Sequence, residues 1–337
     1  MDFDFSEEQK LLRDTMRDLL RRSCTPADVR AAWDDPSGRS SQRWQKLGEV
    51  GILGVTTPED FGGYGGDEID LVLLLEEAGR AVLPEPLLEH AALGAPLLSR
   101  AGTEAQKAEW LPRLATGQAS VTVGLASSPF VADATADLVI LERDGELHAL
   151  TQDRLTLEPR TSVDHARKLF RVTAETGTET RMAAAGPHRQ WIADHGAAAA
   201  AAELVGIAGA LLERTVEYVQ QREQFGHKIG SFQAVQHKLA ELYVLVESSR
   251  SAAYYAAYAL ANDLPDAAVA VSVAKAYAGD AERRANNDAL QLHGGIGFTW
   301  EHDLHFWLKK GKALELAYGD ADHHRRRIAD WVYATAG

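Results

Sequence analysis

Apolar residues near the start of the chain recur at helical spacing. Between Ser6 and about Cys24 the repeat predicts an amphipathic helix, with Ser6 as its N-terminal cap. The apolar positions are Leu11, Leu12, Met16, Leu19 and Leu20. Glycine-dense sequence over 57–66 indicates a loop, and the run 69–80 is apolar nearly all round, which is typical of a buried helix. A further helix is expected over about 87–98.

The middle of the chain has a different pattern, in which short apolar or β-branched runs alternate with polar turns. These runs cover 120–125, 138–141 and 169–172. From Gly196 onward the sequence is rich in alanine and returns to helical periodicity. The sequence therefore predicts an α+β fold in three domains: an N-terminal helical domain over 1–119, a reduced middle β-domain over 120–186 and a C-terminal four-helix-bundle domain over 187–337.

Charge and composition limit which classes of partner the chain can bind and where in the cell it is expected. Its formal net charge of -14 disfavours nucleic acid, because that affinity rests on Lys and Arg that neutralise phosphates. No apolar stretch approaches the roughly 18 residues that a membrane span needs. The acidic N-terminus lacks the basic start of a signal peptide, so we expect a cytoplasmic protein without a membrane span. The single cysteine, Cys24, cannot supply a multi-thiolate metal site, and no metal is expected.

Three motifs carry the candidate chemistry. The first, within 44–80, combines a Pro-Glu-x-x-Gly-Gly-x-Gly loop with a Glu-Glu-x-Gly-Arg helix end. The second runs from Arg222 to Leu242 and contains Arg-x-x-Phe-Gly and Phe-Gln-x-x-Gln, and the third is Gln-x-x-Gly-Gly-x-Gly over 291–297. Taken singly these patterns are weak, since each is more often a solvated helix end or a plain C-cap. In this order and spacing they resemble the acyl-CoA dehydrogenase family over nearly the whole chain.

The resemblance implies FAD as the cofactor. The residues that would hold its diphosphate and adenine are Arg222, Gln224, Phe225, Phe232, Gln233, Gln291, Gly294 and Gly295. Arg222 offers a planar, permanently charged fork for the diphosphate, and the glutamines offer neutral donors and acceptors. Gly294 and Gly295 permit both a helix stop and the close approach of a ligand. In the family this arm of FAD is reached across a dimer interface, so an oligomer is implied as well.

The catalytic base of the family is missing from both of its usual positions. Alignment of Gly319 and Arg325 with the C-terminal pattern of the family places Tyr318 where a glutamate is expected. The alternative position, at the start of the first long C-terminal helix, falls on Gly196. A phenol with an ordinary pKa near 10 is a poor base at pH 7. No catalytic residue is therefore assigned. If the loop is displaced, the nearby groups that could act as a base are Asp320, Asp322, Glu315, His323 and His324, and Asp320 is the candidate we single out.

The flavin-ring pocket is reduced too, because the region 121–128 lacks the loop and the tryptophan strand that face the ring in the family. The leading hypothesis is the FAD-cradle subunit of a heteromeric (α2β2) acyl-CoA dehydrogenase whose longer partner supplies the glutamate. Members that shorten steroid side chains are the nearest resemblance, so the expected substrate is a steroid-derived or branched acyl-CoA. The alternatives are a self-sufficient homotetramer with a displaced base, a flavin monooxygenase of the same fold and a non-enzymatic scaffold.

Overall fold

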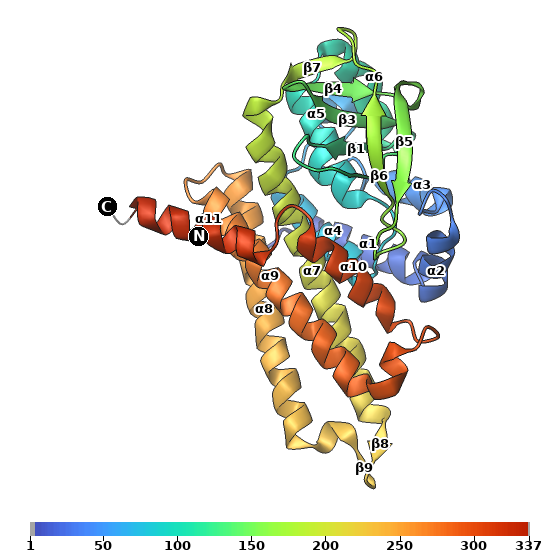
Figure 1. Cartoon of the computed structure of the whole chain (residues 1–337). Coiled ribbons are helices and arrows are strands. Elements are labelled where there is room, and N and C mark those ends of the chain that lie inside the picture. The colour runs from blue at the N-terminus through green and yellow to red at the C-terminus, as the bar shows by residue number, and fades with distance from the viewer. Residues whose placement is uncertain (1–3, 336–337) are drawn as a thin grey trace.

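Helices, strands and helices follow one another along the chain in the predicted order (Figure 1). The structure is a computed structural model, and it describes residues 4–335. The predicted α+β class is confirmed. The predicted boundaries fall near the start of β1 and the start of α7, but that the three parts fold as separate units stays a prediction. Residues 1–3, which contribute to the acidic N-terminus, lie outside the described residues.

The first part is helical. Its elements are α1 (Glu7–Ser23), α2 (Pro26–Asp34), α3 (Ser41–Glu49), η1 (Glu59–Phe61), α4 (Glu68–Arg80), η2 (Leu88–Gly94), α5 (Ala95–Ala101) and α6 (Glu104–Ala115). Ser6 caps α1 as predicted, because its Oγ accepts from the Gln9 backbone N–H at 3.1 Å while the Gln9 side chain accepts from the Ser6 N–H at 2.8 Å. The middle of α4 is buried on all sides, as its all-round apolar sequence indicates.

The β-domain consists of two small sheets. Its strands are β1 (Val121–Gly124), β2 (Val131–Ala132), β3 (Leu138–Arg143), β4 (Glu146–Leu150), β5 (Leu155–Arg160), β6 (Leu169–Ala174) and β7 (Arg181–Ala184), with η3 (Gln152–Arg154) before β5. The sheet orders are β1-β3-β4-β7 and β2-β6-β5. The two-residue turn Asp144-Gly145 joins β3 to β4 with positive φ at both residues, the geometry that suits the twist of a hairpin.

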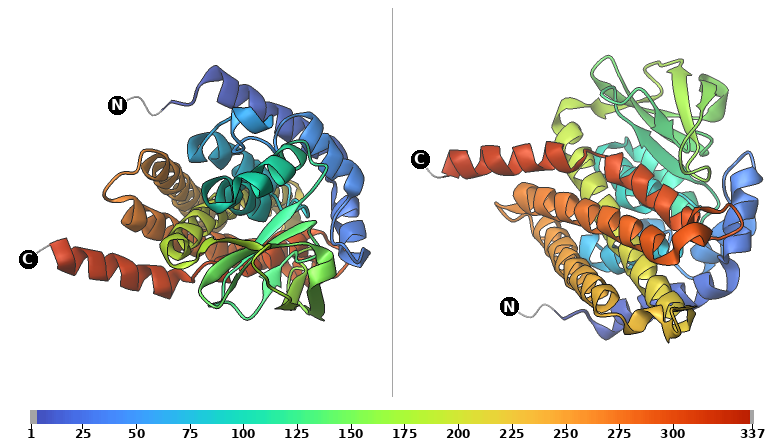
Figure 2. Two further views of the ribbon diagram at one scale, coloured as in Figure 1. Left: turned by 90° about the horizontal axis from the view of Figure 1, so that it is seen from above. Right: turned by 60° about the horizontal axis from the view of Figure 1, so that its bottom comes forward.

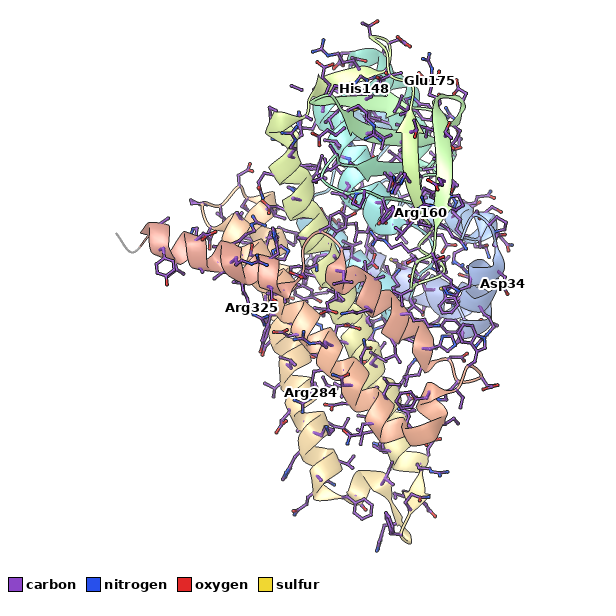
Figure 3. All side chains as sticks on the ribbon, viewed as in Figure 1. Asp34, His148, Arg160, Glu175, Arg284 and Arg325 are labelled. Carbon is purple, nitrogen blue, oxygen red and sulfur yellow. The ribbon has the colours of Figure 1, made fainter. Side chains whose placement is uncertain are left out.

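The C-terminal part is built around one long helix. Its elements are α7 (Gly186–Gln221), β8 (Glu223–Gln224), β9 (His227–Lys228), η4 (Ile229–Ser231), α8 (Gln233–Ala261), α9 (Ala267–His293), η5 (Gly294–Phe298), α10 (Leu304–Leu316) and α11 (Ala321–Thr335). Helix α11 begins against α9, where Arg325, labelled in Figure 3, forms an ion pair with Asp280. The far end of α11 projects beyond the bundle (Figure 2). The exposed residues 329–335 form that projecting end.

Helix α7 is a long central helix that runs from the β-domain to the β8–β9 hairpin (Figure 1). By length and composition it could cross a membrane, with a mean hydropathy of 1.5 over 18 residues, which corrects the expectation that no apolar stretch is long enough. However, 94% of that window is buried inside the protein, as in the core helix of a soluble fold. It is the only such helix between residues 4 and 335.

Glycines bring α7 and α4 into backbone contact. A Cβ added to Gly206 of α7 would lie within 3.0 Å of the Glu76 carbonyl oxygen, and a Cβ on Gly79 of α4 would lie equally close to the Glu203 carbonyl oxygen. Because these neighbours are backbone atoms, neither position has room for a side chain. The glycine of the Glu-Glu-x-Gly-Arg motif is therefore explained by helix packing.

Candidate functional site

The predicted cradle residues gather at one end of the helical bundle. That end is formed by the last turn of α7, the β8–β9 hairpin, the start of α8 and the end of α9. Tyr218 of α7 stacks on His293 of α9 with ring centroids 4.3 Å apart, and its hydroxyl donates to the His293 carbonyl oxygen at 3.3 Å. These contacts join the last turn of α7, just before the second motif, to the third motif. The end lies away from the β-domain, at the bottom of the view in Figure 1.

The cradle is an open surface in this chain. Seven of its residues are exposed and Phe232 is half-buried. Phe225 has a φ of +56° and leaves 91% of its surface in solvent, with only a loose edge contact to Phe232. Gly294 ends α9 with a φ of +64°, so the predicted helix stop is observed. A Cβ added to Gly294 or Gly295 would meet no atom within 4 Å, and the surface therefore has space for a ligand.

The charge of this surface suits an anion. Arg222 forms no ion pair with any residue between 4 and 335. Helix α8 begins at Gln233 without a side-chain cap, so the first backbone N–H groups and the positive end of the helix dipole face solvent. A guanidinium and a free helix N-terminus at the same end of the bundle are suitable groups for holding a diphosphate. The residues present thus fit the FAD arm that the sequence predicts, and their roles in binding it stay predictions.

The two expected base positions face each other. Gly196 is buried in α7, and Tyr318 lies between α10 and α11 with a φ of +56°. A Cβ added to Gly196 would lie within 3.0 Å of three ring carbons of Tyr318. Burial raises the pKa of the Tyr318 phenol, and the carboxylate of Glu89 raises it further. Tyr318 therefore stays protonated at neutral pH, and neither position offers a base.

Asp320 caps the N-terminus of α11. It is exposed, and its Oδ1 accepts from the His323 backbone N–H at 2.8 Å at the start of α11. That hydrogen bond lowers the pKa of Asp320, which makes the carboxylate a weaker base than a free one. The position is that of a helix cap. A catalytic role for Asp320 stays an untested prediction.

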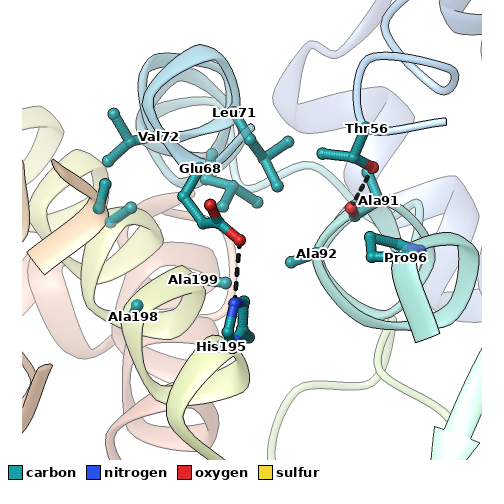
Figure 4. Close-up of a pocket in the computed structure, with 13 residues that line it drawn as sticks. Thr56, Glu68, Leu71, Val72, Ala91, Ala92, Pro96, His195, Ala198 and Ala199 are labelled. Atoms are coloured by element: carbon teal, nitrogen blue, oxygen red, sulfur yellow. Dashed lines mark hydrogen bonds and ion pairs between the residues drawn. The ribbon is translucent and has the colours of Figure 1, made fainter. Parts of the chain in front are cut away.

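An apolar pocket between α4 and α7 was not anticipated from the sequence (Figure 4). His195 enters it from α7, and its Nε2 lies 2.9 Å from Glu68 Oε1 of α4. His195 Nδ1 is 2.8 Å from the Trp191 carbonyl oxygen, so both ring nitrogens face acceptors. Burial tends to raise the pKa of Glu68, but the hydrogen bond and charge of His195 outweigh it and lower the pKa.

The pocket itself is small and lined mainly by alanines and leucines. Its free space of about 30 Å³ holds one or two water molecules and no acyl chain. His195 has no free nitrogen for a substrate, and Glu68 is already hydrogen-bonded to it. The arrangement is an ion pair between α4 and α7, and it does not replace the missing base.

The cradle and the base positions are far apart within one chain. They are separated by 26 residues, from Gly196 to Arg222, along α7 and its end. At a rise of 1.5 Å per residue this is about 39 Å.

Comparison with known proteins decides the family. The family model described as "Acyl-CoA dehydrogenase, C-terminal domain" matches residues 189–333, and the model of the N-terminal domain matches residues 6–118. The chain is 34% identical to the acyl-CoA dehydrogenase IpdE2 of Mycolicibacterium smegmatis over 330 residues, which cover 97% of this chain and 100% of that protein. The chain belongs to the acyl-CoA dehydrogenase family.

Solved structures agree with this assignment. The Tcur3481-Tcur3483 steroid acyl-CoA dehydrogenase has a TM-score of 0.88 and 28% identity, over 98% of this chain and 99% of that one. The ChsE4-ChsE5 complex of Mycobacterium tuberculosis has a TM-score of 0.90 at 24% identity, over 99% of each chain, and shows the shared fold. An acyl-CoA dehydrogenase of Bacillus anthracis with this fold was solved with FAD; its TM-score is 0.89 at 20% identity, over 99% of this chain and 68% of that one.

The predicted enzyme class is confirmed at the level of the family. Acyl-CoA dehydrogenases are oxidoreductases that act on a CH–CH bond, and FAD is their cofactor. The fold expected from the resemblance, helical domain, small β-domain and helical domain, is the one observed. The subunit type, the partner and the substrate are finer questions than family membership answers.

Proposed function

We propose that this chain is the FAD-cradle subunit of a heteromeric acyl-CoA dehydrogenase with α2β2 composition. Its longer partner supplies the catalytic glutamate, the flavin-ring pocket and the thioester site. One observation carries the proposal: Gly196 and Tyr318 occupy both base positions of the family and pack against each other. A homo-oligomer of this chain has no base at either place.

The reaction is the α,β-desaturation of an acyl-CoA thioester. FAD, when bound, would supply the acceptor for a hydride from the β-carbon, and a carboxylate of tuned pKa would remove the α-proton. In this chain Arg222 and the N-terminus of α8 hold the diphosphate, and Gln233 and Gln291 offer hydrogen bonds to the same arm. Phe225 offers a flat apolar face to the adenine. The chain thus binds and orients the cofactor, and proton removal belongs to the partner.

The separation within the chain supports a shared site. Because the cradle lies about 39 Å along α7 from Gly196, it serves a flavin whose ring lies on a neighbouring subunit. This argument calls for an oligomer, and the missing base makes a hetero-oligomer the better choice. The similarity to a steroid acyl-CoA dehydrogenase whose name joins two chains favours a steroid-derived or branched acyl-CoA as substrate.

Expression with and without a partner tests the proposal. The chain is produced alone and together with a longer acyl-CoA dehydrogenase chain of the same organism, and FAD per subunit and dehydrogenation are measured for each preparation. We expect no activity and little bound FAD for the chain alone, and stable FAD in the complex. Stoichiometric FAD that bleaches when acyl-CoA is added to the chain alone would identify a self-sufficient enzyme and contradict the proposal.

The cradle is tested by a pair of variants in the same hairpin region. Arg222→Ala removes the charge expected at the diphosphate, and Lys228→Ala removes an equal charge from β9. We expect Arg222→Ala to weaken FAD binding by the complex about 10- to 100-fold, because charge-assisted hydrogen bonds to phosphate are lost. Lys228→Ala should change it less than about threefold. Equal FAD affinity in Arg222→Ala and wild-type complexes would remove the arginine from the cradle and favour a scaffold that has lost its flavin.

A further inference from the structure

A charged cluster joins the β-domain to the N-terminal helices, and its charges act on the pKa of Tyr318 in the C-terminal part. Glu89 comes from η2 of the N-terminal helices, and Arg167 comes from the loop between β5 and β6. Their side chains pair at 2.8 Å, with Glu89 buried and Arg167 half-buried. Asp133, which follows β2, is also buried, and burial together with the charge of Glu89 raises its pKa to about 8. The β-domain thus contacts the helices through charged side chains of its own.

The space around this cluster is filled. Tyr318 lies against Gly196 so closely that a single added Cβ would overlap its ring. The cavity beside Glu89, Asp133 and Arg167 has about 20 Å³ of free space, room for one water molecule. Neither a flavin ring nor a thioester fits there. Gly196 and Tyr318, which fill each other's space, stand at the two positions from which a base of the family would reach the α-carbon of a substrate.

The loop that carries Tyr318 is fixed from behind. Lys275 of α9 is buried, and its Nζ donates to the carbonyl oxygens of Glu315 and Gly319, each at 2.8 Å. His324 of α11 is also buried, and its Nε2 lies 3.0 Å from the Tyr318 carbonyl oxygen. Tyr318 has the left-handed φ that side chains rarely adopt, so these hydrogen bonds hold a conformation that the residue alone would avoid.

We propose that Tyr318 and the Glu89–Arg167 ion pair form an interdomain lock, which fills from within the place where a complete acyl-CoA dehydrogenase holds its flavin ring and thioester. The inference rests on the proposed function and extends it, because it names what occupies the second, unused site of the heteromer. The lock replaces the ligand as the contact between the β-domain and the helices. The chain is therefore closed and stable without a flavin ring of its own.

Two substitutions at Tyr318 test the lock in the full chain. Tyr318→Ala removes the ring, and Tyr318→Phe keeps the ring and removes only the hydroxyl. Both keep a Cβ, so the cost of the left-handed backbone is the same in each variant and in the wild type. We expect Tyr318→Ala to lower the equilibrium constant of folding about 100-fold or more in urea titrations, because it leaves a hole against Gly196 of α7. Tyr318→Phe should lower it about tenfold at most.

Riboflavin provides a second measurement that does not depend on the cradle, because it carries the flavin ring without the diphosphate. Titrations followed by riboflavin fluorescence should show no saturable binding to the isolated wild-type chain. Saturable one-to-one binding to the wild type, or a folding constant of Tyr318→Ala within a few-fold of the wild type, would overturn the lock. These two results do not test the proposed function. That function is tested separately, by the FAD content of the complex and by the FAD affinity of the Arg222→Ala variant.

Discussion

At the residue scale, the burial of His324 beside the Tyr318 loop makes the stability of the protein depend on pH. His324 is fully buried, and its ring lies between Ser272 Oγ at 3.3 Å and the Tyr318 carbonyl oxygen at 3.0 Å. Burial lowers its pKa from an ordinary 6.5 to about 4, and the charge of the nearby Lys275 acts in the same direction. The folded protein therefore keeps His324 neutral where an unfolded chain would protonate it.

This shift predicts a loss of stability in acid. Between pH 6.5 and 4 the unfolded state binds more protons at this residue than the folded state, so the free energy of unfolding falls as the pH falls. From pH 7 to pH 5 the contribution of one such histidine is about 2 kcal/mol. The measurement is urea unfolding of the wild type and of His324→Gln at both pH values. We expect the loss between the two pH values to be smaller in the variant by about that amount.

Equal pH slopes in the two proteins would show that His324 is protonated in the folded state or not enclosed. A control comes from His323, the exposed neighbour, since His323→Gln should keep the wild-type slope. His90, also buried and with a pKa lowered to about 4 by burial, contributes equally to all three proteins and cancels in the comparison.

Single residues also show what sequence reasoning reached and what it missed. The motif pattern named Arg222, Gln233 and Gly294, and the structure places them at one end of the bundle. It also named Gly196 and Tyr318 as base positions, but their contact joins residues more than a hundred positions apart, and no local pattern encodes such a pair. The ion pair Glu89–Arg167 was missed too. Charged residues are ordinarily exposed, so no sequence pattern gives a reason to place these two in the interior.

At the scale of elements, the packing of α7 on α4 depends on one kind of residue. Gly206 of α7 has backbone atoms of α4 where its side chain would be, whereas Gly209, one turn later, has only the Arg250 side chain at 3.5 Å and Val246 at 4.0 Å. Gly206→Ala should therefore destabilise the chain by at least about 2 kcal/mol, because the helices must separate. Gly209→Ala should be neutral or stabilising by up to about 1 kcal/mol, since alanine favours helix more than glycine.

Denaturant unfolding of the two glycine variants measures this contrast within one helix. A similar stability for both variants would show that α4 and α7 can move apart at little cost. Helical periodicity predicted both helices, and the Glu-Glu-x-Gly-Arg motif marked the end of α4. Which glycine lies at the crossing was beyond the sequence, because crossing points follow from three-dimensional ridges and grooves and not from the period of one helix.

At the scale of the whole molecule, the exposed cradle end differs from the closed interior near Tyr318. The cradle end shows Phe225 to solvent in a left-handed conformation, and among the described residues Ile296 and Phe298 lie exposed nearby in sequence to Gly294. Apolar surface of this kind is typical of a face that a ligand or another chain covers. The fold was predictable from the sequence because three motifs fix the order of its parts. The partner subunit could not be predicted, since the residues of its surface are not part of this sequence.

This view predicts opposite effects of one substitution on the isolated chain and on the complex. Phe225→Gly should stabilise the isolated chain by about 1 kcal/mol, because glycine adopts the φ of +56° without the cost that phenylalanine bears. In the complex the same variant should retain less FAD, since the flat apolar face at the adenine is gone. Thermal unfolding of the chain alone and FAD content of the purified complex are the two measurements.

Asp263→Gly is the matched control, because Asp263 has a φ of +48° in the loop between α8 and α9, at the other end of the bundle. Asp263→Gly relieves the same kind of backbone strain, but less of it, because aspartate tolerates this region better than phenylalanine. It should leave the FAD content of the complex unchanged. If Phe225→Gly instead destabilises the isolated chain, the ring packs within its own chain. If the complex keeps its FAD, Phe225 does not contact the cofactor. A gain in the chain together with a loss in the complex identifies a residue held in a costly conformation for a site that only assembly completes.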